Sequence, residues 1–121
     1  MGGFRMIGAR TIAEEAFLRF DRATITTPNG QSITRVVVAH PGAVAVVPIL
    51  DDDVFLFEQH RAPLGRDLLE IPAGKLDVPG EDRREAARRE LEEEIGFSAG
   101  RLEHLTDFIT TPGFCDEVIT I

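Results

Sequence analysis

The sequence of 121 residues contains one cysteine and lacks tryptophan and tyrosine. A single cysteine excludes an internal disulfide framework and is typical of proteins in the reducing cytosol, so we expect a cytoplasmic location. No motif surrounds Cys115, and we expect a small, buried, apolar side chain there and not a nucleophile. No apolar run approaches the roughly 20 residues that a membrane-spanning helix needs. Residues 1–10 lack the basic-then-apolar pattern of a signal peptide. The sequence therefore predicts a globular chain with no membrane partner.

Positive charge is scarce. The chain has 13 Lys and Arg residues against 21 Asp and Glu residues, which gives a net charge of −8. A nucleic-acid-binding surface needs clustered Lys and Arg, so we expect no nucleic-acid partner. If the substrate is an anionic phosphate compound, metal ions are the obvious link between an acidic protein and its ligand.

The first forty residues predict a β-hairpin. Residues 16–27 alternate loosely between apolar and polar side chains, and residues 33–39 predict a second strand. Pro28-Asn29-Gly30 between them is a strong turn signal. We therefore expect residues 1–40 to form an N-terminal hairpin segment and residues 41–121 to form the domain that follows.

Two more strands and a long loop are expected before the middle of that domain. Residues 43–50 are almost wholly apolar, which suits a strand buried on both faces. Asp51-Asp52-Asp53 predicts a tight polar turn, and residues 54–59 predict the next strand. Residues 63–80 carry three prolines and three glycines among polar residues and predict mostly loop.

The convincing helix covers residues 81–95. It follows Pro79-Gly80, carries acidic residues in its first turn, and stops at Gly96, a residue type that ends helices. Residues 102–110 and 117–121 predict strands, separated by a turn at Thr111-Pro112-Gly113. One helix within a series of strands indicates a mixed-sheet domain, either α/β or α+β.

Three carboxylates share one face of this helix. At about 100° per residue, Glu90, Glu93 and Glu94 fall together at spacings of three and four, with only the small Ala86 beside them. The neighbouring face carries the expected buried stripe, which consists of Ala87, Leu91 and Ile95. The helix therefore presents a face on which three carboxylates surround a small alanine side chain.

The helix offers these carboxylates few cations. Glu93 has Arg89 one turn before it, whereas neither Glu90 nor Glu94 has a positive residue at helical spacing. Like charges so placed cost roughly 0.2–0.5 kcal/mol per pair, and a divalent cation would remove that cost. Charge spacing alone favours a solvated acidic helix over a metal site, because helices rich in glutamate are common.

The surrounding sequence favours the metal site. Gly74-Lys-Leu-Asp-Val-Pro-Gly-Glu81 followed by Arg89-Glu90-Leu91-Glu92-Glu93-Glu94-Ile95-Gly96-Phe97 resembles the Nudix box, with one extra residue before Glu81 and Phe97 in an aliphatic position. Membership of the Nudix family implies an α+β fold, an α/β/α sandwich in which a mixed sheet carries the Nudix loop and helix. Here an N-terminal hairpin would precede it.

The flanking segments resemble the ADP-ribose pyrophosphatase branch of that family, and the likeness runs from about Ile33 to the end of the sequence. The segments are His40–Val46, Glu58–Arg61, Leu69–Gly74 and Pro112–Glu117. The resemblance implies a hydrolase that cleaves the diphosphate bond of ADP-ribose to AMP and ribose 5-phosphate.

The resemblance also implies site residues. Mg²⁺, or Mn²⁺ in its place, would bind Glu90, Glu94 and the backbone carbonyl of Ala73, while Glu93 would bind a further metal or position the attacking water. Arg89 would orient the glutamates.

Arg61 would contact the diphosphate, and substrate would also meet the turn at Pro112, Gly113 and Phe114. Glu81 is expected to satisfy the helix dipole and not to bind metal, and Lys75 to be a solvated loop residue.

Members of the family continue for several dozen residues beyond the point that Ile121 corresponds to, and that part normally supplies a loop glutamate as general base. No residue here can be given that role. Three alternatives stay open. One is a Nudix hydrolase for another diphosphate, such as NADH, a nucleotide sugar or a dinucleoside polyphosphate. Another is a catalytically poor module that binds ADP-ribose. The third is a structural domain that binds no metal. The family resemblance further implies a homodimer formed through the N-terminal segment.

Overall fold

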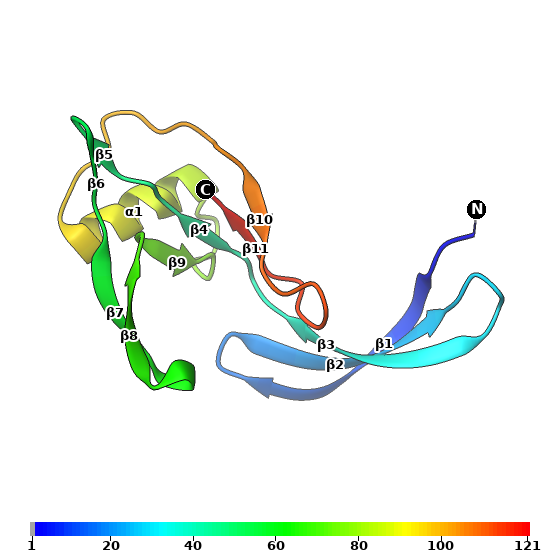
Figure 1. Cartoon of the computed structure of the whole chain (residues 1–121). Helices are drawn as coiled ribbons and strands as arrows, with labels where there is room; N and C mark the ends of the chain where they lie inside the picture. Colours follow the sequence, from blue (N-terminus) through cyan, green and yellow to red (C-terminus); the bar gives the residue numbers. More distant parts are fainter. Residues whose placement is uncertain (1) are drawn as a thin grey trace. The chain divides into compact units, whose positions relative to one another are not determined.

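The computed structural model describes residues 2–121 (Figure 1). The chain divides into two compact units. One takes in the chain up to Gly42 together with Ile109–Val118, and the other consists of Ala43–Phe108 and Ile119–Ile121.

A three-stranded antiparallel sheet forms most of the first unit. Its strands are β1 (Arg5–Glu15), β2 (Leu18–Thr26) and β3 (Ser32–Ala39), with β2 in the centre. The predicted hairpin corresponds to β2 and β3, and their turn includes Gly30 at φ 79°. β1 was not predicted, because every one of its side chains is exposed and no apolar alternation marks it. The expected hairpin is therefore a three-stranded sheet.

The segment Ile109–Val118 of the first unit returns to β3. Val38 donates its N–H to the carbonyl of Phe114 at 2.7 Å, and Asp116 donates to the carbonyl of Val38 at 3.2 Å. Cys115, which forms a parallel bridge with Val38, has a free thiol and is only half-buried, so the expectation of a buried cysteine is met in part. Residues 111–114 form the turn expected around Pro112.

A four-stranded mixed sheet organises the second unit, in the order β10-β11-β4-β9. The strands are β4 (Ala43–Ala45), β9 (Ala73–Lys75), β10 (Asp107–Ile109) and β11 (Val118–Thr120). β4 is parallel to β11 and antiparallel to β9, and its three residues are buried. The mixed sheet with one helix in residues 2–121 confirms the α+β class.

The strand expected at residues 43–50 is broken in the structure. β4 ends at Ala45, and Pro48, which has no N–H to donate to a sheet, precedes a separate exposed strand, β5 (Ile49–Leu50). β5 pairs with β6 (Asp53–Val54) across the predicted aspartate turn, where Asp51 has φ 54°. The strand expected at residues 54–59 is likewise divided between β6 and β7 (Phe57–Arg61).

The prediction that residues 63–80 are mostly loop missed two short strands. This stretch contains β8 (Arg66–Glu70), which pairs with β7, and then β9. Most of the prolines and glycines lie outside these strands: Pro63 and Gly65 belong to the turn around the 3₁₀ helix η1 (Ala62–Leu64), and Pro72 separates β8 from β9. Gly74 is the exception, because it is the second residue of β9. Counting breaker residues therefore hid two short strands.

The predicted helix is present as α1 (Arg83–Ile95), two residues shorter at its start than expected. Asp82 caps it by accepting a hydrogen bond from the N–H of Glu85 at 2.8 Å, and Gly96 ends it at φ 74°. The helix packs against β4 and β9 (Figure 1). Leu91 of the predicted stripe is buried, whereas Ala87 and Ile95 are half-buried. Among the described residues, no helix is long and apolar enough to cross a membrane.

Candidate active site

The second residue of β9 brings the sheet into direct contact with a helix carboxylate. A Cβ atom built on Gly74 would lie 2.0 Å from both the carboxyl carbon and Oε1 of Glu90. Glu90 is buried, with 8% of its surface exposed. Only a residue without a side chain leaves this space, so Gly74 forms a cradle in which the Glu90 carboxylate rests.

The neighbouring strand residue holds a second carboxylate. Ala73 donates its N–H to Oε2 of Glu94 at 2.8 Å. Burial raises the pKa of the Glu94 carboxyl, and the negative charge of Glu90 adds to the increase, while the hydrogen bond from Ala73 and the charge of Arg61 oppose it. Glu90 and Glu94 therefore approach β9 at adjacent residues and influence each other electrostatically.

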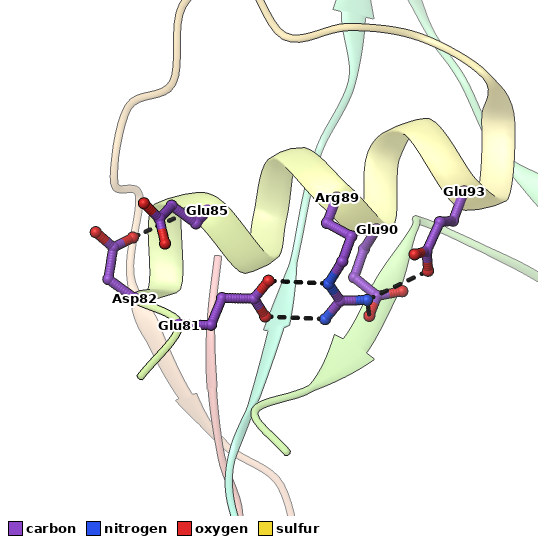
Figure 2. Close-up of polar contacts among 6 residues, drawn as sticks. All are labelled: Glu81, Asp82, Glu85, Arg89, Glu90 and Glu93. Carbon is purple, nitrogen blue, oxygen red and sulfur yellow. Dashed lines mark hydrogen bonds and ion pairs between the residues drawn. The ribbon is translucent and has the colours of Figure 1, made fainter. Parts of the chain in front are cut away.

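Arg89 lies at the centre of an ion-pair network on this face (Figure 2). It donates two hydrogen bonds to Glu81, from Nε at 2.9 Å and from Nη2 at 3.0 Å. Its Nη1 donates to Glu90 at 2.7 Å and to Glu93 at 3.2 Å. The hydrogen bonds with Glu81 are the largest cause of the raised pKa of Arg89, and they lower the pKa of Glu81. One guanidinium thus fixes three carboxylates.

This network corrects two sequence-based expectations and meets a third. Glu90 does have a positive partner, because the Arg89 side chain reaches the adjacent residue as well as the one a turn later. Glu81 does not act as a helix-end residue, since Asp82 takes the cap and Glu81 pairs with Arg89 from outside the helix. The expected pair between Arg89 and Glu93 is present.

Arg61 has a carboxylate partner of its own. It lies at the end of β7, where its Nε donates to Oε1 of Glu70 at 2.6 Å and its Nη2 donates to the other carboxylate oxygen. The charges of both residues affect the pKa of Glu94, so this pair lies within electrostatic reach of the helix carboxylates. Arg61 is therefore near the predicted site, and it is not a strand-end arginine left alone in solvent.

The predicted substrate residues Pro112, Gly113 and Phe114 belong to the other compact unit. There the carbonyl of Phe114 accepts the hydrogen bond from Val38, while the Phe114 ring is 56% exposed. Their contact with substrate remains a prediction. Lys75 lies in β9, paired with Ala43, and not in a loop.

The donors around β9 have the chemistry that a hard divalent cation prefers. They are all oxygens: the carboxylates of Glu90 and Glu94 approach adjacent residues of β9, and the exposed Glu93 lies on the same helix. Within residues 2–121, no three His, Cys, Asp or Glu side chains are already gathered as a metal site. The reason is visible in the contacts, because Glu90 and Glu93 turn toward Arg89. The donor set fits Mg²⁺, and the carboxylates would have to turn to bind it.

A cavity of about 660 Å³ in the same unit is separate from these carboxylates. Its lining includes Val44, Val46, Leu91 and Phe97, and none of Glu90, Glu93 or Glu94. The cavity is also lined by Arg83 and Arg84 at the start of the helix, so different residues of α1 face the cavity and the carboxylate site.

Sequence reasoning missed the roles of Gly74, Glu70 and Glu81 as neighbours of site residues. Each of them contacts a site residue that is 8 to 16 positions away in the sequence. The periodicity of a helix or a strand does not predict contacts over such separations. The only available signal was their position inside the segments that resemble the family.

Comparisons with known proteins agree on a family. The NUDIX domain model matches residues 39–120. The chain is 50% identical over 96 residues to the methanol dehydrogenase activator of Bacillus methanolicus, covering 78% of this chain and 51% of the relative. It is 46% identical over 98 residues to the ADP-ribose pyrophosphatase of Bacillus subtilis (strain 168), covering 80% of this chain and 52% of that protein.

A solved structure agrees with the fold. The crystal structure of an ADP compounds hydrolase has a TM-score of 0.80 and 27% sequence identity, and the match covers 99% of this chain and 65% of that one. The chain spans about half the length of both curated relatives.

Proposed function

The chain belongs to the NUDIX domain family, and from this premise we propose that it hydrolyses the diphosphate bond of ADP-ribose to AMP and ribose 5-phosphate with Mg²⁺. The substrate is supported by the likeness to an ADP-ribose pyrophosphatase and to an ADP compounds hydrolase. The observation that carries the proposal is the pair of carboxylates, Glu90 and Glu94, set against Gly74 and Ala73 of β9.

In this proposal the metal ligands are Glu90, Glu94 and the carbonyl of Ala73, with Glu93 as a further ligand or as the residue that positions water. When bound, a divalent cation supplies charge neutralisation of the diphosphate and a more acidic water. Mn²⁺ prefers the same oxygen donors and is expected to substitute. Because the protein carries a net charge of −8, such a cation would offset the repulsion between the protein and an anionic substrate.

Other residues act on the substrate and on the carboxylates. Arg89 pairs with Glu90 and Glu93, and these ion pairs keep both carboxylates close to β9 before they turn to bind the metal. Arg61 binds the diphosphate, for which a guanidinium provides parallel hydrogen bonds to phosphate oxygens. The turn of Pro112, Gly113 and Phe114 is proposed to contact the substrate as well.

A homodimer through residues 1–40 is proposed, with residues 41–121 as the catalytic domain. The support is the exposed first strand: β1 has no buried residue, and Met6, Ile7 and Ile12 are 56%, 55% and 45% exposed. Apolar side chains along an exposed strand favour covering by a partner. A cytoplasmic location is proposed because the chain has a single cysteine.

Another nucleoside diphosphate derivative is the alternative substrate, supported by the likeness to a solved hydrolase of ADP compounds. Candidates are NADH, nucleotide sugars and dinucleoside polyphosphates. Each would be cleaved at the same kind of bond, so the carboxylate site does not separate them.

Product analysis tests the function. The 121-residue chain is mixed with ADP-ribose and Mg²⁺, and AMP and ribose 5-phosphate are measured, followed by the same assay on the alternative substrates. Glu94→Gln should abolish turnover, whereas Glu92→Gln is the matched control because Glu92 is exposed and contacts Ser98. Tight binding of ADP-ribose without products would favour a binding module. If the chain cleaves another diphosphate faster than ADP-ribose, the proposed substrate is wrong and the proposed carboxylate site stands.

A further inference from the structure

The contact between Arg61 and Glu70 has a defined geometry. The two residues lie on one face of the β7–β8 hairpin, where Arg61 pairs with Arg66 and Glu70 pairs with Phe57. The Arg61 side chain runs back along this face, and its Nε and Nη2 meet the two carboxylate oxygens of Glu70. The contact is a two-point one, which fixes the plane of the guanidinium as well as its distance.

Glu70 is the better fixed member of this pair. Its side chain is 19% exposed, against 45% for Arg61. Two residues after Glu70, the fully buried Pro72 accepts a hydrogen bond from the N–H of Val46 at 2.8 Å, which ties the strand end to the core. Arg61 instead precedes the exposed turn around Leu64. The carboxylate therefore determines where the guanidinium lies.

The contact leaves part of Arg61 available. A guanidinium has five N–H donors in a rigid fork, and Glu70 takes the edge formed by Nε and Nη2. The edge formed by Nη1 and the second Nη2 hydrogen points away from that carboxylate. Three residues after Glu70, Ala73 donates its N–H to Oε2 of Glu94 at 2.8 Å, so the chain that leaves this pair leads directly to the helix carboxylates.

We infer that Glu70 is a positioning residue for diphosphate recognition: it holds Arg61 by one edge so that the other edge meets the diphosphate beside Glu94. This inference rests on the hydrolysis proposed above. Without Glu70, Arg61 would keep its charge and lose its fixed orientation, and each substrate molecule would have to order the side chain on binding.

The test is a double-mutant cycle with Glu70→Gln, Arg61→Ala and the double variant, measured as kcat and KM for ADP-ribose with Mg²⁺. Glutamine keeps the shape of the side chain and places an amide N–H₂ where one carboxylate oxygen accepted. We expect Glu70→Gln to raise KM about tenfold with kcat within about twofold, the pattern of lost binding that is equal in ground and transition states. The double variant should be no worse than Arg61→Ala, because Glu70 acts through Arg61.

Asp67→Asn is the matched control. Asp67 is an exposed acidic residue on the same strand, but its partner is His60, at 2.6 Å. This variant removes one negative charge from the hairpin and leaves the Arg61–Glu70 pair intact, so KM should stay at the wild-type value.

Two results would overturn the positioning role. One is a Glu70→Gln variant with unchanged KM. The other is a double variant whose KM is the product of both single effects, which would mean that Glu70 acts independently of Arg61.

The proposed function is judged separately, by whether the wild-type chain forms AMP. If the chain binds ADP-ribose without hydrolysing it, the Kd of each variant for ADP-ribose is measured by calorimetry. These Kd values are then compared in the same cycle in place of KM, and they test the role of Glu70 in the same way. A wild-type chain that neither binds nor cleaves ADP-ribose overturns both proposals.

Discussion

Gly74 on β9 and Glu90 on α1 approach so closely that a Cβ atom on residue 74 would lie 2.0 Å from the Glu90 carboxyl carbon. Gly74 is not among the glycines with positive φ, so backbone freedom does not explain its presence. Space does. The strand and the helix carboxylate pack together only because this position has no side chain, and that packing sets where the carboxylate can go.

Gly74→Ala should therefore displace Glu90 and damage activity more than stability. A misplacement of about 1 Å at a reacting centre can cost on the order of 100-fold in rate, so we expect a loss of that size in kcat/KM for ADP-ribose. Overpacking typically costs about 1–3 kcal/mol, and the free energy of unfolding should fall by a similar amount. Steady-state kinetics and denaturant unfolding of the same variant measure both effects.

Gly100→Ala is the control, because no atom lies within 4 Å of a Cβ built there and its φ is not positive. It should leave kcat/KM unchanged. An active Gly74→Ala variant with wild-type kinetics would show that Glu90 has no fixed role in the reaction.

The helix was predictable because its signals are local. The carboxylate positions follow from 3.6 residues per turn, and Gly96 ends the helix through its own backbone conformation, φ 74°. Asp82 is a residue type that commonly caps helices, and assigning the N-cap to it predicts the observed start of the helix at Arg83.

The contacts that complete the site could not be predicted in this way. Glu90 meets Gly74 across 16 residues, and Arg89 meets Glu81 across eight, through the path of the loop before the helix. β1 could not be predicted for a different reason. Its side chains are exposed on both faces, so its sequence does not alternate between apolar and polar residues. Short strands such as β9 depend on their partners and carry little pattern of their own.

Arg89→Ala should reduce activity by removing the common partner of three carboxylates. Glu81 and Glu90, whose side chains are only 13% and 11% exposed, would lose a charged hydrogen-bond donor. Loss of a residue that orients metal ligands typically costs about 10–100-fold in activity, and we expect kcat/KM to fall by that factor. Arg89→Lys should restore little of this activity, since an ammonium lacks the planar guanidinium that donates to Glu81 and Glu90 at the same time.

Arg88→Ala provides the comparison on the same helix. Arg88 is exposed and donates to the carbonyl of Ala99, away from Glu90. Equal activity losses in the Arg88 and Arg89 variants would indicate a general effect on the helix and contradict a specific role for Arg89.

Asp21 gives the first unit a pH-dependent stability. Its carboxylate accepts hydrogen bonds from Arg19 and from Thr11, and the hydrogen bonds from Arg19 are the main cause of its lowered pKa. A lowered pKa in the folded state stabilises the protein above the unfolded value, 3.8, and that contribution is lost as the pH falls through the folded value. Asp21→Asn should therefore lower Tm at neutral pH, and the difference from wild type should shrink below about pH 4.

Calorimetry of both proteins between neutral and acid pH measures this difference. Asp52→Asn serves as the control, because Asp52 is an exposed residue of the β5–β6 turn. A difference in Tm that persists undiminished at acid pH would mean that the asparagine is disruptive for a reason other than the lost charge.

Metal binding should be measurable without substrate. A ligand that binds only the folded state at 100 times its Kd stabilises a protein by about 2.7 kcal/mol, which for a domain of this size corresponds to a rise in Tm of roughly 10 °C. Mg²⁺ should raise the Tm of the wild-type chain in this way, because a cation bound between Glu90 and Glu94 offsets the repulsion between their carboxylates. Glu90→Gln should abolish the rise, whereas Glu92→Gln, on the exposed face beside Ser98, should preserve it. If Glu90→Gln responds to Mg²⁺ as the wild type does, the ion binds elsewhere, and the carboxylates on β9 lose their role as metal ligands.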